Sequence, residues 1–302
     1  MIRTNFINRI PVIGSLSKSI KQTIDFMPKG ELPRDVFESN FNYTKRQCVN
    51  EYLNGIHKFT IDDYFSLTEE DKSAIKTACY IDTIAAAEDN VLMGSCLKSI
   101  LDLTYGEGNY VYVSIGTSAA GIGRVMEFSG VETKYLPVSD LRETLTDKHE
   151  AKLGKKFAAY SDFLETQGLS PETIQKSPKQ YLFFDYTAEG TSLNNFEHLL
   201  NKFCSIKGDN VHFYSLNETL EKVEQGLTGK IKGTAAYVNK YLNKPSIAFY
   251  SGIPHLNIDK INKVKKAEKF ESLEAKKYNF CVIDLLYKKG MLQKNSKNNK
   301  AL

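Results

Sequence analysis

Apolar residues in this chain form short continuous runs, separated by longer stretches in which they recur at helical spacing. The runs at 110–115, 133–138, 181–185 and 211–214 are rich in β-branched and aromatic residues. Glycine, proline or polar turns bound them, which is typical of buried strands. Between the runs, apolar residues return every three or four positions, which predicts helices. Strands that alternate with helices through short connections predict an α/β fold with a parallel sheet.

Further elements are predicted on both sides of this alternating region. A helix cap at Thr68, followed by acidic residues, predicts a helical run that ends near Gly106. Beyond the last strand, residues 216–227 have helical spacing. The short apolar runs at 247–250 and 280–284 are interpreted as two more strands.

Composition divides the 302 residues into three parts. We expect residues 1–65 to form a helical N-terminal appendage, 66–290 the α/β domain, and 291–302 a disordered basic tail. The net charge of +4 is small for this length, and lysines at 260–277 and in the tail supply much of it. We expect these lysines to be solvated, so nucleic acid is not favoured as a partner.

The distribution of apolar residues and cysteines also bears on location. No stretch approaches the ~20 uncharged residues that a membrane span needs. The N-terminal region lacks the continuous apolar core and cleavage site of a Sec signal peptide. The five cysteines are scattered, without a CxxC pair or zinc-type spacing, which favours reduced thiols. We expect a cytoplasmic protein, and leave open both export by another route and formation of a homodimer.

The first candidate site is the turn after the strand at 110–115. In an open parallel sheet, ligands bind beyond the carboxyl ends of the strands. Gly116, Thr117 and Ser118 place small residues in front of a predicted helix, where backbone N–H groups can approach a phosphate or pyrophosphate. The alternative is that the tight turn alone requires the glycine.

The second candidate site is the turn after the strand at 181–185, which combines an acid with small residues and hydroxyl groups. Asp185 ends the strand, and its carboxylate could accept hydrogen bonds from ribose hydroxyls, while the following turn could enclose a phosphate. The alternative is that Asp185 and Ser192 only cap the turn and the helix after it. The residues of this turn are Thr187, Ala188, Glu189, Gly190, Thr191 and Ser192.

This second turn resembles the motif with which type I phosphoribosyltransferases bind 5-phosphoribosyl 1-pyrophosphate (PRPP). In that motif an apolar strand ends in two acids, and a Thr-Gly turn with a further hydroxyl follows. Asp185 matches the second acid, Gly190 the glycine and Ser192 the closing hydroxyl. The segment 116–118 is similar to the family's pyrophosphate loop, and the resemblance covers about residues 101–216.

The resemblance implies a three-layer parallel-sheet core and transfer of a phosphoribosyl group with release of pyrophosphate. It also implies Mg²⁺ as cofactor, held at a catalytic Asp185 through ribose hydroxyls or water. Two residues depart from the motif, because Phe184 replaces the first acid and Glu189 stands where threonine is usual. A carboxylate beside a phosphate is repulsive unless a cation lies between them. Binding of a phosphorylated ribose or nucleotide is therefore better supported than its transfer.

Two other functions remain open on the same scaffold. A phosphosugar isomerase would also hold a sugar phosphate in small-residue turns after parallel strands, with 116–118 as its main site. A non-catalytic nucleotide sensor or interaction protein would account for the loss of one acid and for the first hundred residues, which match nothing in the motif.

Overall fold

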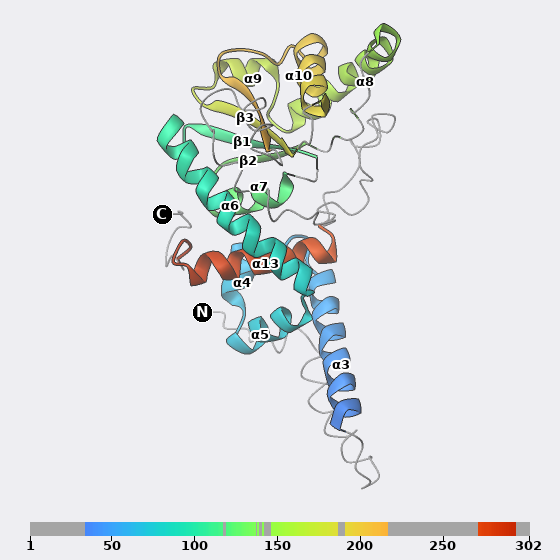
Figure 1. Ribbon diagram of the computed structural model, residues 1–302, viewed down its shortest axis with the longest axis vertical. Helices are drawn as coiled ribbons and strands as arrows, with labels where there is room; N and C mark the ends of the chain where they lie inside the picture. Colours follow the sequence, from blue (N-terminus) through green and yellow to red (C-terminus); the bar gives the residue numbers. More distant parts are fainter. Residues whose placement is uncertain are drawn as a thin grey trace.

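The computed structural model describes residues 34–116, 119–136, 138, 141, 146–186, 191–216 and 271–293, and it shows an α/β fold (Figure 1). Four strands form one sheet in the order β2-β1-β3-β4, and all three pairings are parallel. This confirms the predicted α/β fold with a parallel sheet. The strands are β1 (Tyr110–Ile115), β2 (Thr133–Leu136), β3 (Gln180–Tyr186) and β4 (Val211–Leu216).

Helices cover both faces of the sheet, so the central strands are apolar on both sides. Val111 and Val113 of β1 and Phe183 of β3 face a cluster formed with three helices on one face. Tyr112 and Phe184 face the opposite side, towards two other helices. The first face carries α8 (Asp147–Thr166), α9 (Pro171–Lys176) and α10 (Thr191–Phe203). The second carries α6 (Ile81–Tyr105) and α7 (Ala120–Phe128).

The helical run predicted between Thr68 and Gly106 is two helices. Thr68 caps α5 (Glu69–Ala78) as predicted, and its side chain accepts a hydrogen bond from the backbone N–H of Asp71. The chain then becomes extended at Cys79 and Tyr80 before α6 begins. Apolar residues keep their helical spacing across this break, so the periodicity alone could not show it.

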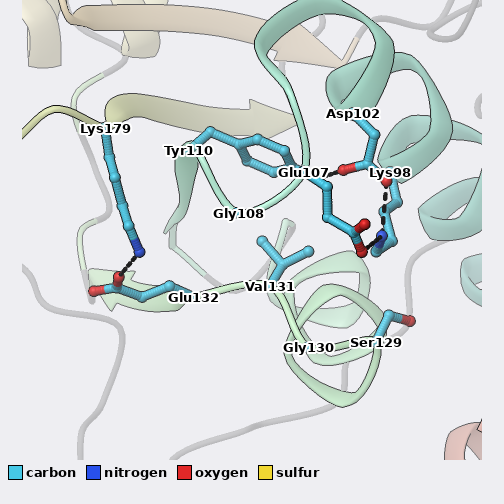
Figure 2. Close-up of a pocket in the computed structure, with 10 residues that line it drawn as sticks. All are labelled: Lys98, Asp102, Glu107, Gly108, Tyr110, Ser129, Gly130, Val131, Glu132 and Lys179. Carbon is cyan, nitrogen blue, oxygen red and sulfur yellow. Dashed lines mark hydrogen bonds and ion pairs between the residues drawn. The ribbon is translucent and has the colours of Figure 1, made fainter. Parts of the chain in front are cut away.

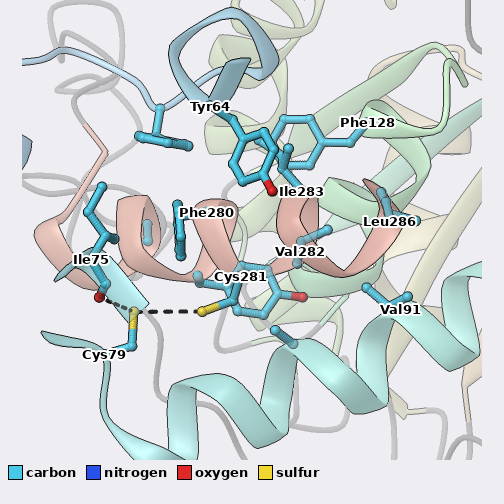
Figure 3. Close-up of a cluster of buried hydrophobic side chains, with 14 of the residues drawn as sticks. Tyr64, Ile75, Cys79, Val91, Phe128, Phe280, Cys281, Val282, Ile283 and Leu286 are labelled. Atoms are coloured by element: carbon cyan, nitrogen blue, oxygen red, sulfur yellow. Dashed lines mark hydrogen bonds between the residues drawn. The ribbon is translucent and has the colours of Figure 1, made fainter. Parts of the chain in front are cut away.

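The strand predicted at 280–284 is wrong, because these residues lie within α13 (Leu273–Lys288). This helix packs against α3 (Arg34–Asn54), α4 (Ile61–Ser66), α5, α6 and α7. Figure 3 shows it between Tyr64 of α4 and Val91 of α6. Phe280 to Ile283 form a short apolar run, and such a run in a helix that is buried by several neighbours looks like a buried strand.

Burial of α13 also corrects the expectation that the late lysines are solvated. Lys276 and Lys277 are buried, and the Lys276 ammonium group donates to the carbonyl of Leu53 at 2.9 Å. The strand predicted at 247–250, most of the helix predicted at 216–227 and most of the tail lie outside the described residues. None of the helices that the structure describes is long and apolar enough to cross a membrane. The division of the chain at residue 65 stays a prediction.

Candidate functional site

The strand order reverses between β1 and β3, and this determines where a ligand can bind. The chain passes from β1 to β2 in one direction across the sheet and from β3 to β4 in the other. Since such crossovers share one handedness, their helices lie on opposite faces. Figure 1 shows α10 above the sheet and α7 below it. The turns after β1 and β3 therefore meet at the carboxyl edge of the sheet, where the strands end, and they lie there between two helix N-termini. This is the usual ligand position in open α/β sheets.

The structure brings the described parts of both predicted turns to this edge. Ser114 of β1 pairs with Phe184 of β3, so Gly116 and Asp185 follow on neighbouring strands, which run about 5 Å apart. Thr191 is the first residue of α10, and Ser192 follows it, both partly buried. The remaining predicted residues lie outside the described ranges; they are Thr117, Ser118, Thr187, Ala188, Glu189 and Gly190.

The turn at Gly116 has a structural requirement for glycine. Its φ angle is +66°, and its N–H donates to the carbonyl of Leu136 at 2.8 Å. A Cβ atom at this position would lie 3.0 Å from the carbonyl oxygen of Val138. Because L-residues with side chains rarely adopt this φ, the turn requires glycine whether or not a ligand binds.

Phe184, which replaces the first acid of the motif, belongs to the core. Its side chain is fully buried, and its ring stacks on that of Tyr112 with the centroids 4.6 Å apart. On its other side it contacts Tyr214 at 5.4 Å. Asp185 is therefore the carboxylate that the end of β3 offers to this edge. Burial raises the pKa of Tyr112, and the negative charge of Asp185 raises it further, so the phenol remains protonated.

Two tyrosine hydroxyls contact the first turn of α7. The Tyr112 hydroxyl donates to the carbonyl of Ala119 at 3.3 Å, and the Tyr278 hydroxyl donates to the carbonyl of Gly121 at 3.0 Å. Sequence reasoning did not identify Tyr278, because it lies 157 residues from Gly121 in the chain. No local motif relates the two positions, so only the tertiary structure could find this contact.

The donor atoms at this edge are compatible with Mg²⁺ only when it arrives with a ligand. Among the described residues, no group of three or more His, Cys, Asp or Glu side chains could hold a metal ion by itself. Asp185 supplies one carboxylate. Protein-bound Mg²⁺ commonly uses one or two carboxylates together with substrate phosphates and water. Asp185 therefore fits Mg²⁺ that is shared with a phosphorylated ligand.

A hollow of about 320 Å³ lies at the opposite, amino edge of the sheet (Figure 2). Its charged side chains pair with one another. Lys98 contacts Asp102 at 2.7 Å, and Lys179 contacts Glu132 at 2.9 Å. The Tyr110 hydroxyl also donates to Asp102, at 2.8 Å. Ligands of open α/β sheets bind at the carboxyl edge, so the position and the internal pairing of this hollow do not favour it as the site.

A cluster of charged groups, in which Arg124 and Glu271 are buried and Lys58 and Glu127 are partly exposed, lies beside α7. Arg124 contacts Glu271 at 2.7 Å and Glu127 at 2.6 Å, and Lys58 contacts Glu127 at 2.5 Å. Burial opposes ionisation of Glu127, but Arg124 and Lys58 outweigh it and hold its pKa below the ordinary value. For Glu271 burial dominates, and its pKa is raised despite Arg124. The cluster joins residues near 58, α7 and the start of α13, so we interpret it as a structural link.

Comparisons with protein-family models, with curated proteins and with solved structures give no match for this chain. Inference about its function therefore depends on the geometry of the edge between β1 and β3. This edge combines the glycine turn, the Asp185 carboxylate and the N-termini of two helices that lie on opposite faces of the sheet.

Proposed function

We propose that the edge between β1 and β3 binds a phosphorylated ribose, with PRPP as the ligand that its residues favour. The observation that supports this is the adjacency of Gly116 and Asp185 at the point where the strand order reverses. In open α/β sheets the ligand crevice forms at such a point, beyond the carboxyl ends of the strands. Two helices begin there, and a helix N-terminus attracts phosphate through its unpaired N–H groups and its dipole.

Each part of PRPP has a complementary group at this edge. The Asp185 carboxylate accepts hydrogen bonds from the ribose hydroxyls and, with water, holds Mg²⁺ that neutralises the phosphates. The start of α10, with Thr191 and Ser192, receives the 5′-phosphate. The start of α7, after Gly116, receives the pyrophosphate. The two phosphate groups thus lie on either side of the ribose.

Transfer of the phosphoribosyl group would require the site to position an acceptor, neutralise the departing pyrophosphate and exclude water. The burial of Phe184 between Tyr112 and Tyr214 favours binding over transfer, because only one carboxylate is then left to orient the ribose hydroxyls. We therefore propose ribose-phosphate binding as the primary function and transfer as the reaction to test on this site.

Isothermal titration calorimetry with PRPP and with ribose 5-phosphate, in the presence of Mg²⁺, tests the proposal. Asp185→Asn removes the charge but keeps the shape, and we expect it to raise the Kd of both ligands about tenfold, or ~1.4 kcal/mol. Asp209→Asn is the matched control, because Asp209 is exposed and lies before β4, at the opposite edge of the sheet. The control should bind like the wild type.

Three outcomes distinguish the functions. If neither ribose ligand binds the wild type at millimolar concentration, the proposal is wrong. Binding of fructose 6-phosphate without binding of PRPP would favour a phosphosugar isomerase instead. Release of pyrophosphate from PRPP when a nucleobase is added would show that transfer takes place.

A further inference from the structure

Two buried cysteines from distant parts of the chain bring their sulfur atoms together. Cys79 and Cys281 are 202 positions apart in the sequence, and their Sγ atoms lie 3.7 Å from each other. The two residues are only 7% and 5% exposed. Figure 3 shows the two side chains pointing toward one another, one from the end of α5 and the other from α13. The fold therefore places the two thiols in direct contact.

Cys79 lies where the chain can adjust its position. It follows the last residue of α5, and the backbone is extended at Cys79 and Tyr80 before α6 begins. Tyr80 and Ile81 are 60% and 84% exposed, so this joint between the helices reaches the surface. A disulfide needs its sulfurs about 2.05 Å apart, so the two atoms have to approach by less than about 2 Å. Rotation of the Cys79 side chain and a small shift of the joint supply a movement of this size.

The hydrogen bonds of the pair indicate the order in which the thiols react. The Cys281 thiol donates to Cys79 Sγ, and the Cys79 thiol donates to the carbonyl of Ile75 at 3.2 Å. The hydrogen bond with Cys79, together with burial, raises the pKa of Cys281, so this thiol stays protonated. Cys79, next to the exposed joint, is therefore the thiol that an oxidant reaches first.

We propose that Cys79 and Cys281 are a disulfide site, which hydrogen peroxide oxidises while the protein stays folded. Peroxide converts the Cys79 thiol to a sulfenic acid and is itself reduced to water. The sulfur of Cys281 then attacks Cys79 Sγ and forms the S–S bond, and the hydroxyl group leaves as water with the proton of Cys281. In total, two thiols and one peroxide molecule give one disulfide and two water molecules. Peroxide is close to water in size, so it enters where a bulky thiol reagent does not.

The bond fastens α13 to the joint between α5 and α6. This helix packs against α3, α4, α5, α6 and α7, so its position holds the helical part of the fold together. A cross-link between residues 202 positions apart strongly restricts the unfolded chain, which stabilises the folded protein. The inference does not depend on the proposed function, because neither cysteine belongs to the carboxyl edge of the sheet.

The test uses the full chain with Cys96→Ser, which removes the exposed cysteine and leaves four of the five. After exposure of the folded protein to hydrogen peroxide, the free thiols counted in denaturant should fall from four to two. Peptide mapping without reduction should find Cys79 and Cys281 joined. Dithiothreitol should restore all four thiols, since it reduces a disulfide but not a sulfinic acid.

Two controls separate this pair from oxidation in general. Cys204 is also buried, but its thiol donates to the carbonyl of Phe157 at 3.3 Å, so it should remain reduced. The oxidised Cys96→Ser protein should unfold at a urea concentration about 1 M higher than the reduced one. Adding Cys281→Ser should abolish both the joined peptides and this increase.

Each result decides one part of the inference. If four thiols persist, or if mapping finds a different pair, the disulfide site is wrong. If Cys79 and Cys281 are joined but the urea midpoint does not rise, the fastening of α13 is wrong. Ribose-phosphate binding is measured on the reduced protein, so the proposed function can fail or stand in either case.

Discussion

Replacing Arg124 by methionine would leave the carboxyl group of Glu271 buried without its neighbouring cation. Arg124 Nη2 lies 2.7 Å from Glu271 Oε1, and the two side chains are only 4% and 3% exposed. Glu271 also accepts hydrogen bonds from the backbone N–H of Phe59 and from Asn279. These bonds do not replace a full positive charge, so we expect Glu271 to bind a proton in the folded variant.

The expected loss of stability follows from the free energy needed to protonate the carboxyl group of Glu271. Protonating a carboxyl group of ordinary pKa 4.5 at pH 7 costs about 3.4 kcal/mol, since each pH unit corresponds to ~1.36 kcal/mol. At pH 5 the same step costs only about 0.7 kcal/mol. Above pH 4.5 the folded variant binds more protons than the unfolded chain, so its stability falls as the pH rises. Because the pKa of Glu271 is already raised in the wild type, part of this cost is present there, and Arg124→Met should be destabilised by at most about 3 kcal/mol at pH 7 and by much less at pH 5.

Urea unfolding at pH 5, 6 and 7 measures this difference. The second background is Glu271→Gln, which has no carboxyl group to titrate at this position, so the cost of adding Arg124→Met should depend less on pH in this background than in the wild type. Glu127 also loses Arg124, which is the largest cause of its lowered pKa, but it does so in both backgrounds and keeps Lys58 as a partner, so its contribution cancels in the comparison. A loss of stability in Arg124→Met that is equal at pH 5 and pH 7 would refute the reasoning.

Two further predictions concern packing and thiol exposure. Gly94→Ala would place a Cβ atom 2.6 Å from Cγ1 of Val125 where α6 crosses α7, so we expect a loss of about 1–3 kcal/mol in urea unfolding. Adding Val125→Ala should cost less in this variant than in the wild type, and equal costs would contradict the contact. Titration of the native protein with a thiol reagent should modify Cys96 rapidly and the four other, buried cysteines only on unfolding. A second fast thiol would contradict the described burial.

The strands and turns of the sheet could be predicted because their signals are local. The run at 110–115 lies between glycines and consists of β-branched and aromatic residues, and it is β1 in the structure. The turn after it was recognisable from Gly116. This residue has a positive φ in the structure, and glycine is the residue that adopts such a φ most readily. The acid near the end of β3 was also a local signal, because Asp185 interrupts an apolar run.

Helix α13 could not be predicted, because its local sequence fits two structures. Residues 280–284 are short and apolar, which suits a central strand as well as a helix buried on all sides. Contacts with α3, α4, α5, α6 and α7 decide between them, and these elements come from distant parts of the chain. Tyr278 was missed for this reason, because its role depends on a helix whose position is set by tertiary packing.

The amino-acid sequence is sufficient to predict an α/β protein with parallel strands and two small-residue turns at strand ends. Periodicity, β-branched runs and glycine act over a few residues, so they can be read along the chain. That β1 and β3 are neighbours, and that Gly116 and Asp185 lie at the same end of the sheet, became known from the fold. It also placed Phe184 in the core and Tyr278 against α7. Strand order and helix docking depend on contacts between distant segments, and no local pattern specifies which segments meet.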